Sequence, residues 1–197
     1  MRKRSFFMKL VEDKIRELGK IGEGDVLKVD SFLNHQMDPM LLANMGEEFF
    51  RLFEKEGVTK ILTIEASGIG VAMMAAYKFG VPMVFAKKTK TNNIFADVYR
   101  STVESYTHKK TYEIIVSKEF INPGDRILVV DDFLAKGSAL LALISLVKEA
   151  GAEVVGCGVV IEKAYQGGGK IVRDMGIRVE SLARIKEMSL EGGITYC

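Results

Sequence analysis

The amino-acid sequence predicts an α/β protein with a mostly parallel sheet flanked by helices on both faces. Short and largely apolar runs at 60–64, 126–130 and 154–161 are typical of strands that are buried on both sides. Between such runs, residues 71–79 and 138–150 carry apolar side chains at helical spacing. Strands that alternate with helices indicate a parallel sheet, and 197 residues are enough for one such domain.

The N-terminal part predicts two helices separated by a short strand. Residues 6–18 have apolar side chains at helical spacing, and a glycine-rich stretch ends this helix. Residues 26–36 indicate a short strand that leads into a polar loop. Asp38 is a suitable N-cap and proline suits the first helical position, so we expect a second helix over 39–56.

The middle of the chain predicts a strand, a mobile polar stretch and a hairpin. The strand covers 81–86, and the polar residues 87–93 follow it. Residues 98–107 and 111–116 indicate the two arms of a hairpin. The turn-forming residues 122–125 then separate this hairpin from the buried strand that follows.

Composition and charge favour a cytoplasmic protein without a nucleic-acid or membrane partner. The formal net charge is only +2, so the chain as a whole is not strongly attracted to polyanions. No apolar run approaches the length of a bilayer span. The two cysteines, Cys157 and Cys197, suggest neither a metal site nor a disulfide framework, which fits a reducing compartment.

Two adjacent carboxylates, Asp131 and Asp132, follow the apolar strand at 126–130. Such a pair can accept hydrogen bonds from neighbouring hydroxyl groups or hold a hydrated magnesium ion. The small residues after the pair lead into a helix, where backbone N–H groups and the helix dipole favour a phosphate. Together these features suggest a site for a ribose 5-phosphate. The alternative is that the two acids cap a helix or remain solvated.

The run from Val129 to Ala139 resembles the phosphoribosyl pyrophosphate motif of type I phosphoribosyltransferases. The resemblance implies that Asp131 and Asp132 are catalytic residues that contact the ribose hydroxyls, with Mg²⁺ as the cofactor that accompanies phosphoribosyl pyrophosphate. It also implies that the 5-phosphate is held by Ala135, Lys136, Gly137, Ser138 and Ala139.

The segment 65–70 looks like the pyrophosphate loop of the same family. The resemblance implies that Ser67 and Gly68 contact the pyrophosphate. It further implies that Lys87 or Lys88 neutralises the charge of this group. An ordinary strand-to-helix turn and two solvated lysines are the alternatives.

Two further parts of the chain resemble the xanthine branch of this family. Residues 27–36 look like its N-terminal hood segment, and 159–165 together with 179–185 look like the C-terminal partner. The resemblance runs from about Met8, which it implies as the natural start, to about residue 190. The implied organisation is a homodimer of a single domain over 1–197, with a hood from about 20–38 and 160–197 and a lid over about 87–112.

Three residues are implied to bind xanthine by this resemblance: Leu27, Asn34 and Lys163. A lysine can donate to O6 and N7 of a 6-oxopurine, whereas it would repel the amino group of adenine. The Asn34 amide can donate to the oxygen at position 2 of xanthine. After rotation it can accept from the amino group of guanine, so the preference between these two bases stays open.

The implied reaction transfers the 5-phosphoribosyl group of phosphoribosyl pyrophosphate to N9 of xanthine, which gives xanthosine 5′-monophosphate and pyrophosphate in purine salvage. The alternatives are a guanine or hypoxanthine enzyme and a non-catalytic regulator that senses phosphoribosyl pyrophosphate. Ala135 stands where the hypoxanthine-guanine branch has an aspartate, so the sequence identifies no general base.

Overall fold

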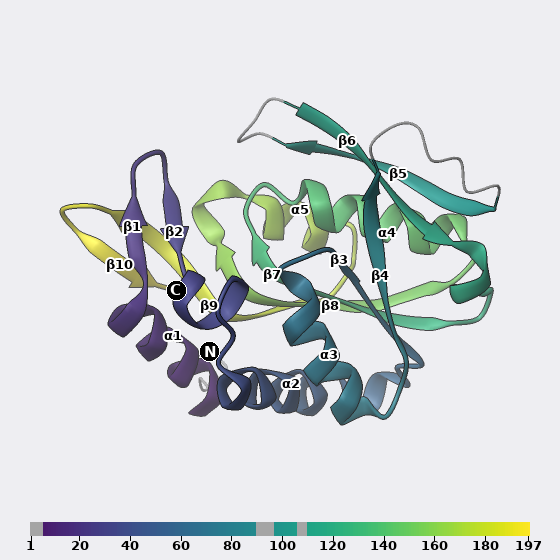
Figure 1. Cartoon of the computed structure of the whole chain (residues 1–197), viewed down its shortest axis with the longest axis horizontal. Helices are drawn as coiled ribbons and strands as arrows, with labels where there is room; N and C mark the ends of the chain where they lie inside the picture. Colours follow the sequence, from purple (N-terminus) through teal and green to yellow (C-terminus); the bar gives the residue numbers. More distant parts are fainter. Residues whose placement is uncertain (1–5, 90–96, 106–109) are drawn as a thin grey trace.

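The computed structural model describes residues 6–89, 97–105 and 110–197, and it confirms the predicted α/β architecture (Figure 1). The strands are β1 (Lys20–Gly22), β2 (Val26–Lys28), β3 (Lys60–Ile64), β4 (Met83–Thr89), β5 (Val98–Ser105), β6 (Lys110–Ser117), β7 (Arg126–Leu134), β8 (Glu153–Lys163), β9 (Val179–Ser189) and β10 (Gly193–Tyr196). The central sheet has eight strands in the order β10-β9-β8-β7-β3-β4-β6-β5. The strands from β9 to β4 in this order are parallel, and antiparallel pairs form both edges.

Helices cover both faces of this sheet. They are α1 (Phe6–Leu18), α2 (Pro39–Phe53), α3 (Gly68–Phe79), α4 (Ser138–Glu149) and α5 (Gly168–Asp174), with shorter helical turns η1 (Asp30–Asn34), η2 (Glu54–Glu56), η3 (Lys118–Phe120) and η4 (Ala164–Gln166). Helices α1, α2 and α3 share one apolar core with the sheet, and α4 and α5 share the other (Figure 1). Alternate residues of β7 point into the two cores, as the two-residue period of a strand requires.

Two glycines of β8 let helix α2 approach the sheet closely. A Cβ atom at Gly156 would lie 2.4 Å from the Phe53 ring, and one at Gly158 would lie 2.8 Å from the Phe49 ring. Phe49 and Phe53 are one helical turn apart and completely buried. Glycine inside a strand often marks such a close approach, which explains its presence in an otherwise apolar run.

The order of the strands reverses at β3, which lies between β4 and β7. In parallel sheets, ligands bind where the strand order changes, at the carboxyl ends of the strands. Strand β3 pairs with β7 only as far as Val129, whereas β8 pairs with β7 up to Leu134. The last residues of β7 therefore project beyond β3 and form one wall of an open end of the sheet.

Strand β7 is longer than its apolar pattern predicted. The prediction ended it at Val130, so it placed Asp131 and Asp132 after the strand, and this placement was wrong. Pairing of Asp131, Phe133 and Leu134 with β8 keeps the backbone extended, whatever the polarity of the side chains. Both carboxylates therefore stand on a hydrogen-bonded strand rather than on a loop.

Strand β4 and helix α3 also have different limits from those predicted. Lys87 and Lys88 belong to β4, where they pair with β6, and not to a mobile stretch. Residues 90–96 and 106–109, the rest of that stretch and the tip of the predicted hairpin, lie outside the described residues. Helix α3 begins at Gly68 rather than at Val71.

The elements at the two ends of the chain were predicted only in part. The helices at α1 and α2 are confirmed, and Asp38 caps α2 by accepting from the N–H groups of Met40 and Leu41. No pattern indicated β1, α5, β9 or β10; β1 and β10 have only three and four residues, which is too short for a periodicity. No helix in the described part of the chain has the length and hydropathy to cross a membrane.

Candidate active site

Asp131 and Asp132 are almost completely buried near the end of β7, with 5% and 6% of their surface exposed. The Asp132 N–H donates to Oδ1 of Asp131 at 3.0 Å. Burial and the charge of Asp132 raise the pKa of Asp131 well above its ordinary value, while the charge of Lys88 acts in the opposite direction. A ligand that brings hydroxyl donors or a cation would stabilise this pair.

The carboxylate pair has the chemistry of a magnesium ligand but does not complete a coordination shell. Magnesium prefers oxygen ligands, keeps several waters and is commonly held by one or two carboxylates together with substrate phosphates. Within residues 6–89, 97–105 and 110–197, no group of three or more acidic, histidine or cysteine side chains could hold a metal ion. The pair therefore fits a hydrated cation that arrives with a diphosphate.

Residues 135–137 connect β7 to α4, and together with the first two residues of α4 they form the 135–139 loop, which lines a cleft of about 650 Å³. Gly137 has a φ of +91°, a left-handed conformation that glycine adopts without strain. Its carbonyl accepts the Leu141 N–H at 2.9 Å, which is the first hydrogen bond of α4. The loop thus leads into a helix N-terminus, whose unpaired N–H groups and dipole favour an anion.

Gly168, at the start of α5, packs directly against this loop. Its N–H donates to the Ala135 carbonyl at 3.1 Å. A Cβ atom at Gly168 would lie 2.4 Å from the Ala135 oxygen and 2.5 Å from the Gly137 nitrogen, so any larger residue must displace the loop backbone. Gly168 was not among the predicted site residues, although the run of three glycines at 167–169 was a signal for such a close approach.

The same cleft is lined by Leu27 of β2, Phe133 of β7 and Lys163 at the end of β8. Leu27 and Lys163 are only 6% and 8% exposed. Burial lowers the pKa of Lys163, and the charge of Asp25 opposes this effect. A partly desolvated ammonium group beside an aromatic ring and an aliphatic side chain can recognise a planar heterocycle that carries oxygen acceptors.

Asn34 lies in a second hollow of about 410 Å³, which it shares with Asp30, His35 and Ser67. The structure therefore groups Asn34 with a residue of the predicted pyrophosphate loop, and not with the residues that line the first cleft. The Asn34 Oδ1 atom is buried and has no hydrogen-bond partner among the described residues. An unpaired buried acceptor of this kind is stabilised when a ligand donates to it or when the amide rotates.

Gly68 joins the predicted pyrophosphate loop to the carboxylate pair. A Cβ atom at Gly68 would lie 2.3 Å from the Thr63 Oγ1 atom and 2.8 Å from Oδ1 of Asp131. The end of β3 and the end of β7 thus meet at a position that only glycine can occupy. This contact places the 65–70 segment directly beside Asp131.

Lys87 and Lys88 have different environments because successive strand residues point to opposite faces. The charge of Lys88 influences Asp131, and its Nζ lies 5.4 Å from the centre of the Tyr112 ring, which lines the first cleft. The Lys88 N–H donates to Oε1 of Glu65 at 2.6 Å. Lys87 instead lines a separate apolar groove between β4, β6 and η3. Of the two predicted lysines, Lys88 is the one beside the carboxylates.

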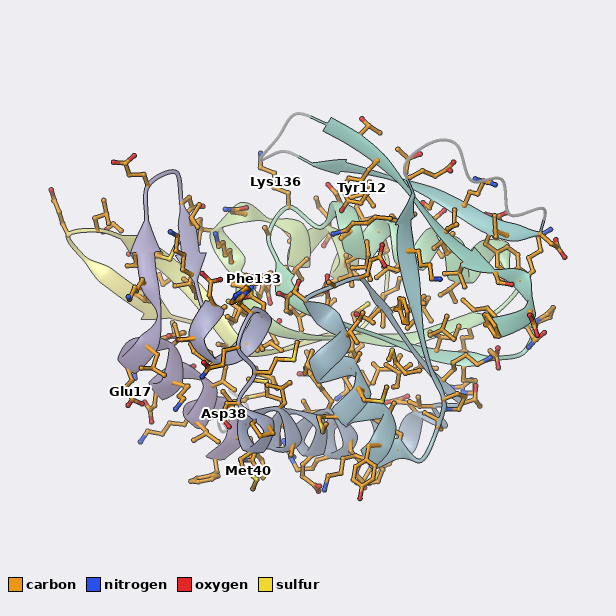
Figure 2. The ribbon with its side chains drawn as sticks, in the orientation of Figure 1. Glu17, Asp38, Met40, Tyr112, Phe133 and Lys136 are labelled. Atoms are coloured by element: carbon orange, nitrogen blue, oxygen red, sulfur yellow. The ribbon has the colours of Figure 1, made fainter. Side chains whose placement is uncertain are left out.

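Most of the predicted site residues thus gather at one end of the sheet. Figure 2 marks Phe133, Lys136 and Tyr112, which line the first cleft together with the 135–139 loop. Sequence reasoning did not assign Phe133, Tyr112 or Asp25 to the site. No local pattern could have found Asp25, because its partner Gln166 is 141 residues away in the chain.

The chain is similar to known proteins over most of its length. The family described as the phosphoribosyl transferase domain matches residues 35–179. A xanthine phosphoribosyltransferase of Lachnoclostridium phytofermentans is 58% identical over 186 residues, which cover 94% of this chain and 96% of that relative. A xanthine phosphoribosyltransferase of Bacillus cytotoxicus is 51% identical over 189 residues, which cover 96% and 95%.

Solved structures with the same fold agree with this result. The APRTase from Giardia lamblia complexed with 9-deazaadenine has a TM-score of 0.74 and 25% identity, with 87% of this chain and 96% of that chain covered. The adenine phosphoribosyltransferase from Rhodothermus marinus has a TM-score of 0.73 at 24% identity, with 88% and 98% covered, and supports the fold alone.

The buried charge of Asp131 should destabilise the ligand-free protein, so we expect Asp131→Asn to raise its melting temperature. Burial raises the pKa of Asp131 in the folded protein above its value in the unfolded chain. The free energy of unfolding therefore falls as the pH rises from the unfolded-state pKa to the folded-state pKa, and the loss is complete above the latter. Each kcal/mol gained in the free energy of unfolding raises the melting temperature of a domain of this size by about 2–4 °C. Thermal unfolding at about pH 8 and about pH 5 tests this, with the larger increase expected at the higher pH.

Asp125→Asn is the matched control of opposite sign. Burial acts to raise the Asp125 pKa, but hydrogen bonds from Lys60, at 2.6 Å, and from the Asn122 N–H lower it overall. The ionised Asp125 therefore stabilises the fold, and its loss should lower the melting temperature at about pH 8. A lower melting temperature for Asp131→Asn at both pH values would show that its charge is already compensated in the ligand-free protein.

Proposed function

The chain belongs to the phosphoribosyltransferase family, and we propose that it transfers the 5-phosphoribosyl group of phosphoribosyl pyrophosphate to N9 of xanthine. The products are xanthosine 5′-monophosphate and pyrophosphate, and the reaction belongs to purine salvage. One observation carries the proposal: the 135–139 loop and the buried Lys163 line a single cleft at the carboxyl ends of the strands. The names of relatives that are 58% and 51% identical support xanthine as the acceptor.

We assign the phosphoribosyl pyrophosphate site to the groups around the end of β7. The 135–139 loop would hold the 5-phosphate through its backbone N–H groups at the start of α4. Asp131 and Asp132 would accept hydrogen bonds from the ribose hydroxyls, which would replace the hydration that these buried carboxylates lack. Ser67, Gly68 and Lys88 would contact the diphosphate, with Lys88 rather than Lys87 as the neutralising cation.

Asp131 and Asp132 would also hold Mg²⁺, in company with the oxygens of the substrate. When bound, the ion lowers the negative charge on the diphosphate leaving group. The chain's own contribution is to fix the two carboxylates on β7 beside the loop at 65–70. Their buried charge also favours the positive charge that develops on the ribose during transfer.

The acceptor base would lie between the aromatic ring of Phe133 and the side chain of Leu27. Lys163 would donate to O6 and N7, which are acceptors in any 6-oxopurine. Asn34 lines the second hollow rather than this cleft, and its assignment to the oxygen at position 2 stays a prediction. Its buried Oδ1 has no partner in the described structure. We assign no general base, because xanthine ionises near neutral pH and its N9 can attack C1 of the ribose while the C1–oxygen bond to pyrophosphate breaks.

A hood and a lid would exclude water from this reaction. We propose that 20–38 and 160–197 form the hood and that the lid lies within about 87–112, of which 90–96 and 106–109 are outside the described residues. Such a lid would prevent water from intercepting the ribose cation. Val103 and Tyr112, from the two arms of the β5–β6 hairpin, line the cleft and support this assignment.

We also expect the protein to be a homodimer in the cytoplasm. The thiol of Cys157 is buried, and burial raises its pKa to about 12. Such a free thiol suits a reducing compartment.

Initial rates with Mg²⁺ and phosphoribosyl pyrophosphate test the proposal, with xanthine, guanine, hypoxanthine and adenine offered separately. The highest kcat/KM is expected for xanthine. A preference for guanine or hypoxanthine would contradict the assignment of the acceptor but keep the phosphate site. Binding of phosphoribosyl pyrophosphate without transfer to any base would favour the sensing regulator.

Replacement of Lys163 by methionine should weaken acceptor recognition selectively. Methionine fills a similar volume but donates no hydrogen bond, so we expect kcat/KM for xanthine to fall by about 5–150-fold, the equivalent of one lost buried hydrogen-bond partner. The KM for phosphoribosyl pyrophosphate should stay within about twofold, because the 135–139 loop is unchanged. Lys170→Met, at an exposed lysine of α5 paired with Asp174, is the control and should leave both constants unchanged.

Replacement of Gly168 by alanine should weaken the 5-phosphate site without touching the ligand. Its methyl group would push on the Ala135 and Gly137 backbone, so we expect the KM for phosphoribosyl pyrophosphate to rise about tenfold or more. Gly167→Ala is the control: Gly167 has a φ of +82° but open space around it, so the variant loses stability without moving the loop. Equal KM values for phosphoribosyl pyrophosphate in the two variants would exclude a positioning role for Gly168.

A further inference from the structure

Asp25 lies in the turn between β1 and β2 and has a φ of +66°. It is the only residue other than glycine with a positive φ in the described part of the chain. Aspartate and asparagine adopt this conformation more readily than other side chains, but it is still less favourable than the ordinary regions. Specific contacts of Asp25 must therefore hold this turn in place.

Those contacts all reach Lys163, the last residue of β8, and the η4 turn that follows it. The Lys163 Nζ donates to the main-chain oxygen of Asp25. Tyr165 Oη donates to Oδ1 of the Asp25 carboxylate at 2.5 Å, and Gln166 Nε2 donates to Oδ2. One residue of the N-terminal hairpin thus binds three side chains within four residues of the end of β8, at a separation of 138 to 141 positions along the chain.

The same residues line the cleft. Asp25, Lys163 and Gln166 belong to its wall together with the 135–139 loop. Lys163 is 8% exposed, so its ammonium group has little access to water and depends on protein or ligand acceptors. An ammonium group has three donors, and the Asp25 carbonyl occupies one of them.

We infer that Asp25 is a positioning residue for acceptor recognition, which fixes the Lys163 ammonium group and the 163–166 segment at the wall of the cleft. The main-chain carbonyl fixes one N–H of Lys163 and leaves two donors for the ligand. A 6-oxopurine presents two adjacent acceptors, O6 and N7, which match this number. The carboxylate holds Tyr165 and Gln166, so the segment that carries Lys163 cannot move away from the hairpin. The inference rests on the proposed function for the identity of the acceptor.

Two substitutions separate the carboxylate from the backbone conformation. Asp25→Gly keeps the positive φ and the carbonyl that binds Lys163, but it removes both acceptors of Tyr165 and Gln166. Asp25→Asn keeps the shape and one acceptor oxygen, so it can satisfy only one of these two partners. Glu23→Gly, at an exposed residue of the same turn, adds equal flexibility without removing the contacts and is the matched control.

We expect Asp25→Gly to raise the KM for the acceptor about tenfold, because the 163–166 segment loses its two side-chain hydrogen bonds to the hairpin. The kcat and the KM for phosphoribosyl pyrophosphate should stay within about threefold of the native values. Asp25→Asn should lie between native and Asp25→Gly. Glu23→Gly should retain the native acceptor KM. A purely structural role would instead lower the melting temperature and change all kinetic constants together, which would overturn the inference.

Tyr165→Phe gives an independent test that does not alter the turn. It removes only the hydroxyl that donates to Asp25, so its effect on the acceptor KM should be smaller than that of Asp25→Gly. In the double variant the two effects should not add, because both remove the same contact. Additive effects, or an unchanged acceptor KM in both single variants, would overturn the inference.

The measurement uses whichever purine the native protein transfers best, which keeps the two proposals distinct. If xanthine is that purine and the Asp25 variants behave like Glu23→Gly, only the role of Asp25 fails. If guanine or hypoxanthine is preferred and the Asp25 variants raise its KM, the acceptor assignment fails while the positioning role stands. If the native protein transfers to no purine, both proposals fail.

Discussion

The burial of two adjacent carboxylates near the end of the central strand is the constraint on which the rest of the site depends. Strand β3 stops pairing with β7 at Val129, so Asp131 and Asp132 stand where the sheet opens, while β8 still holds their backbone in line. Desolvation and the neighbouring charge of Asp132 raise the pKa of Asp131 and so oppose its ionisation. The ligand-free site is therefore arranged at a cost in stability, and a hydroxyl-rich ligand with a cation removes that cost.

Close contacts between backbones complete the arrangement around these carboxylates. Gly68, the first residue of α3, lies against Thr63 of β3 and Asp131 of β7, at a distance that a Cβ atom would not allow. Gly168 supports the 135–139 loop in the same way. Because neither position carries a side chain, the 65–70 segment can approach Asp131 and the 135–139 loop keeps its course along the cleft.

The sequence predicted the strands and helices whose apolar residues follow a clear period, and it predicted the loop at 135–139 because a local motif encodes it. It failed where pairing with a neighbouring strand overrides local polarity, as for Asp131 in β7 and Lys88 in β4. It failed again for Asp25 and Gly168. Their roles depend on residues that are distant in the chain, and neither hydrogen bonds nor excluded volume at such separations leave a periodic pattern.

The seven residues 163–169 connect the two halves of the cleft. Lys163 stands at one end of this segment, and Gly168 supports the 135–139 loop near the other. Glu162, the residue before this segment, is its anchor to α5 and β9. It is 1% exposed and accepts two hydrogen bonds from Arg173 of α5, each of 2.8 Å, and one from Ser181 of β9. Burial of Glu162 acts to raise its pKa, but these donors lower it overall, so the anchor is charged at neutral pH. One anchored segment therefore carries both Lys163, at the wall of the cleft, and the glycine that supports the 135–139 loop.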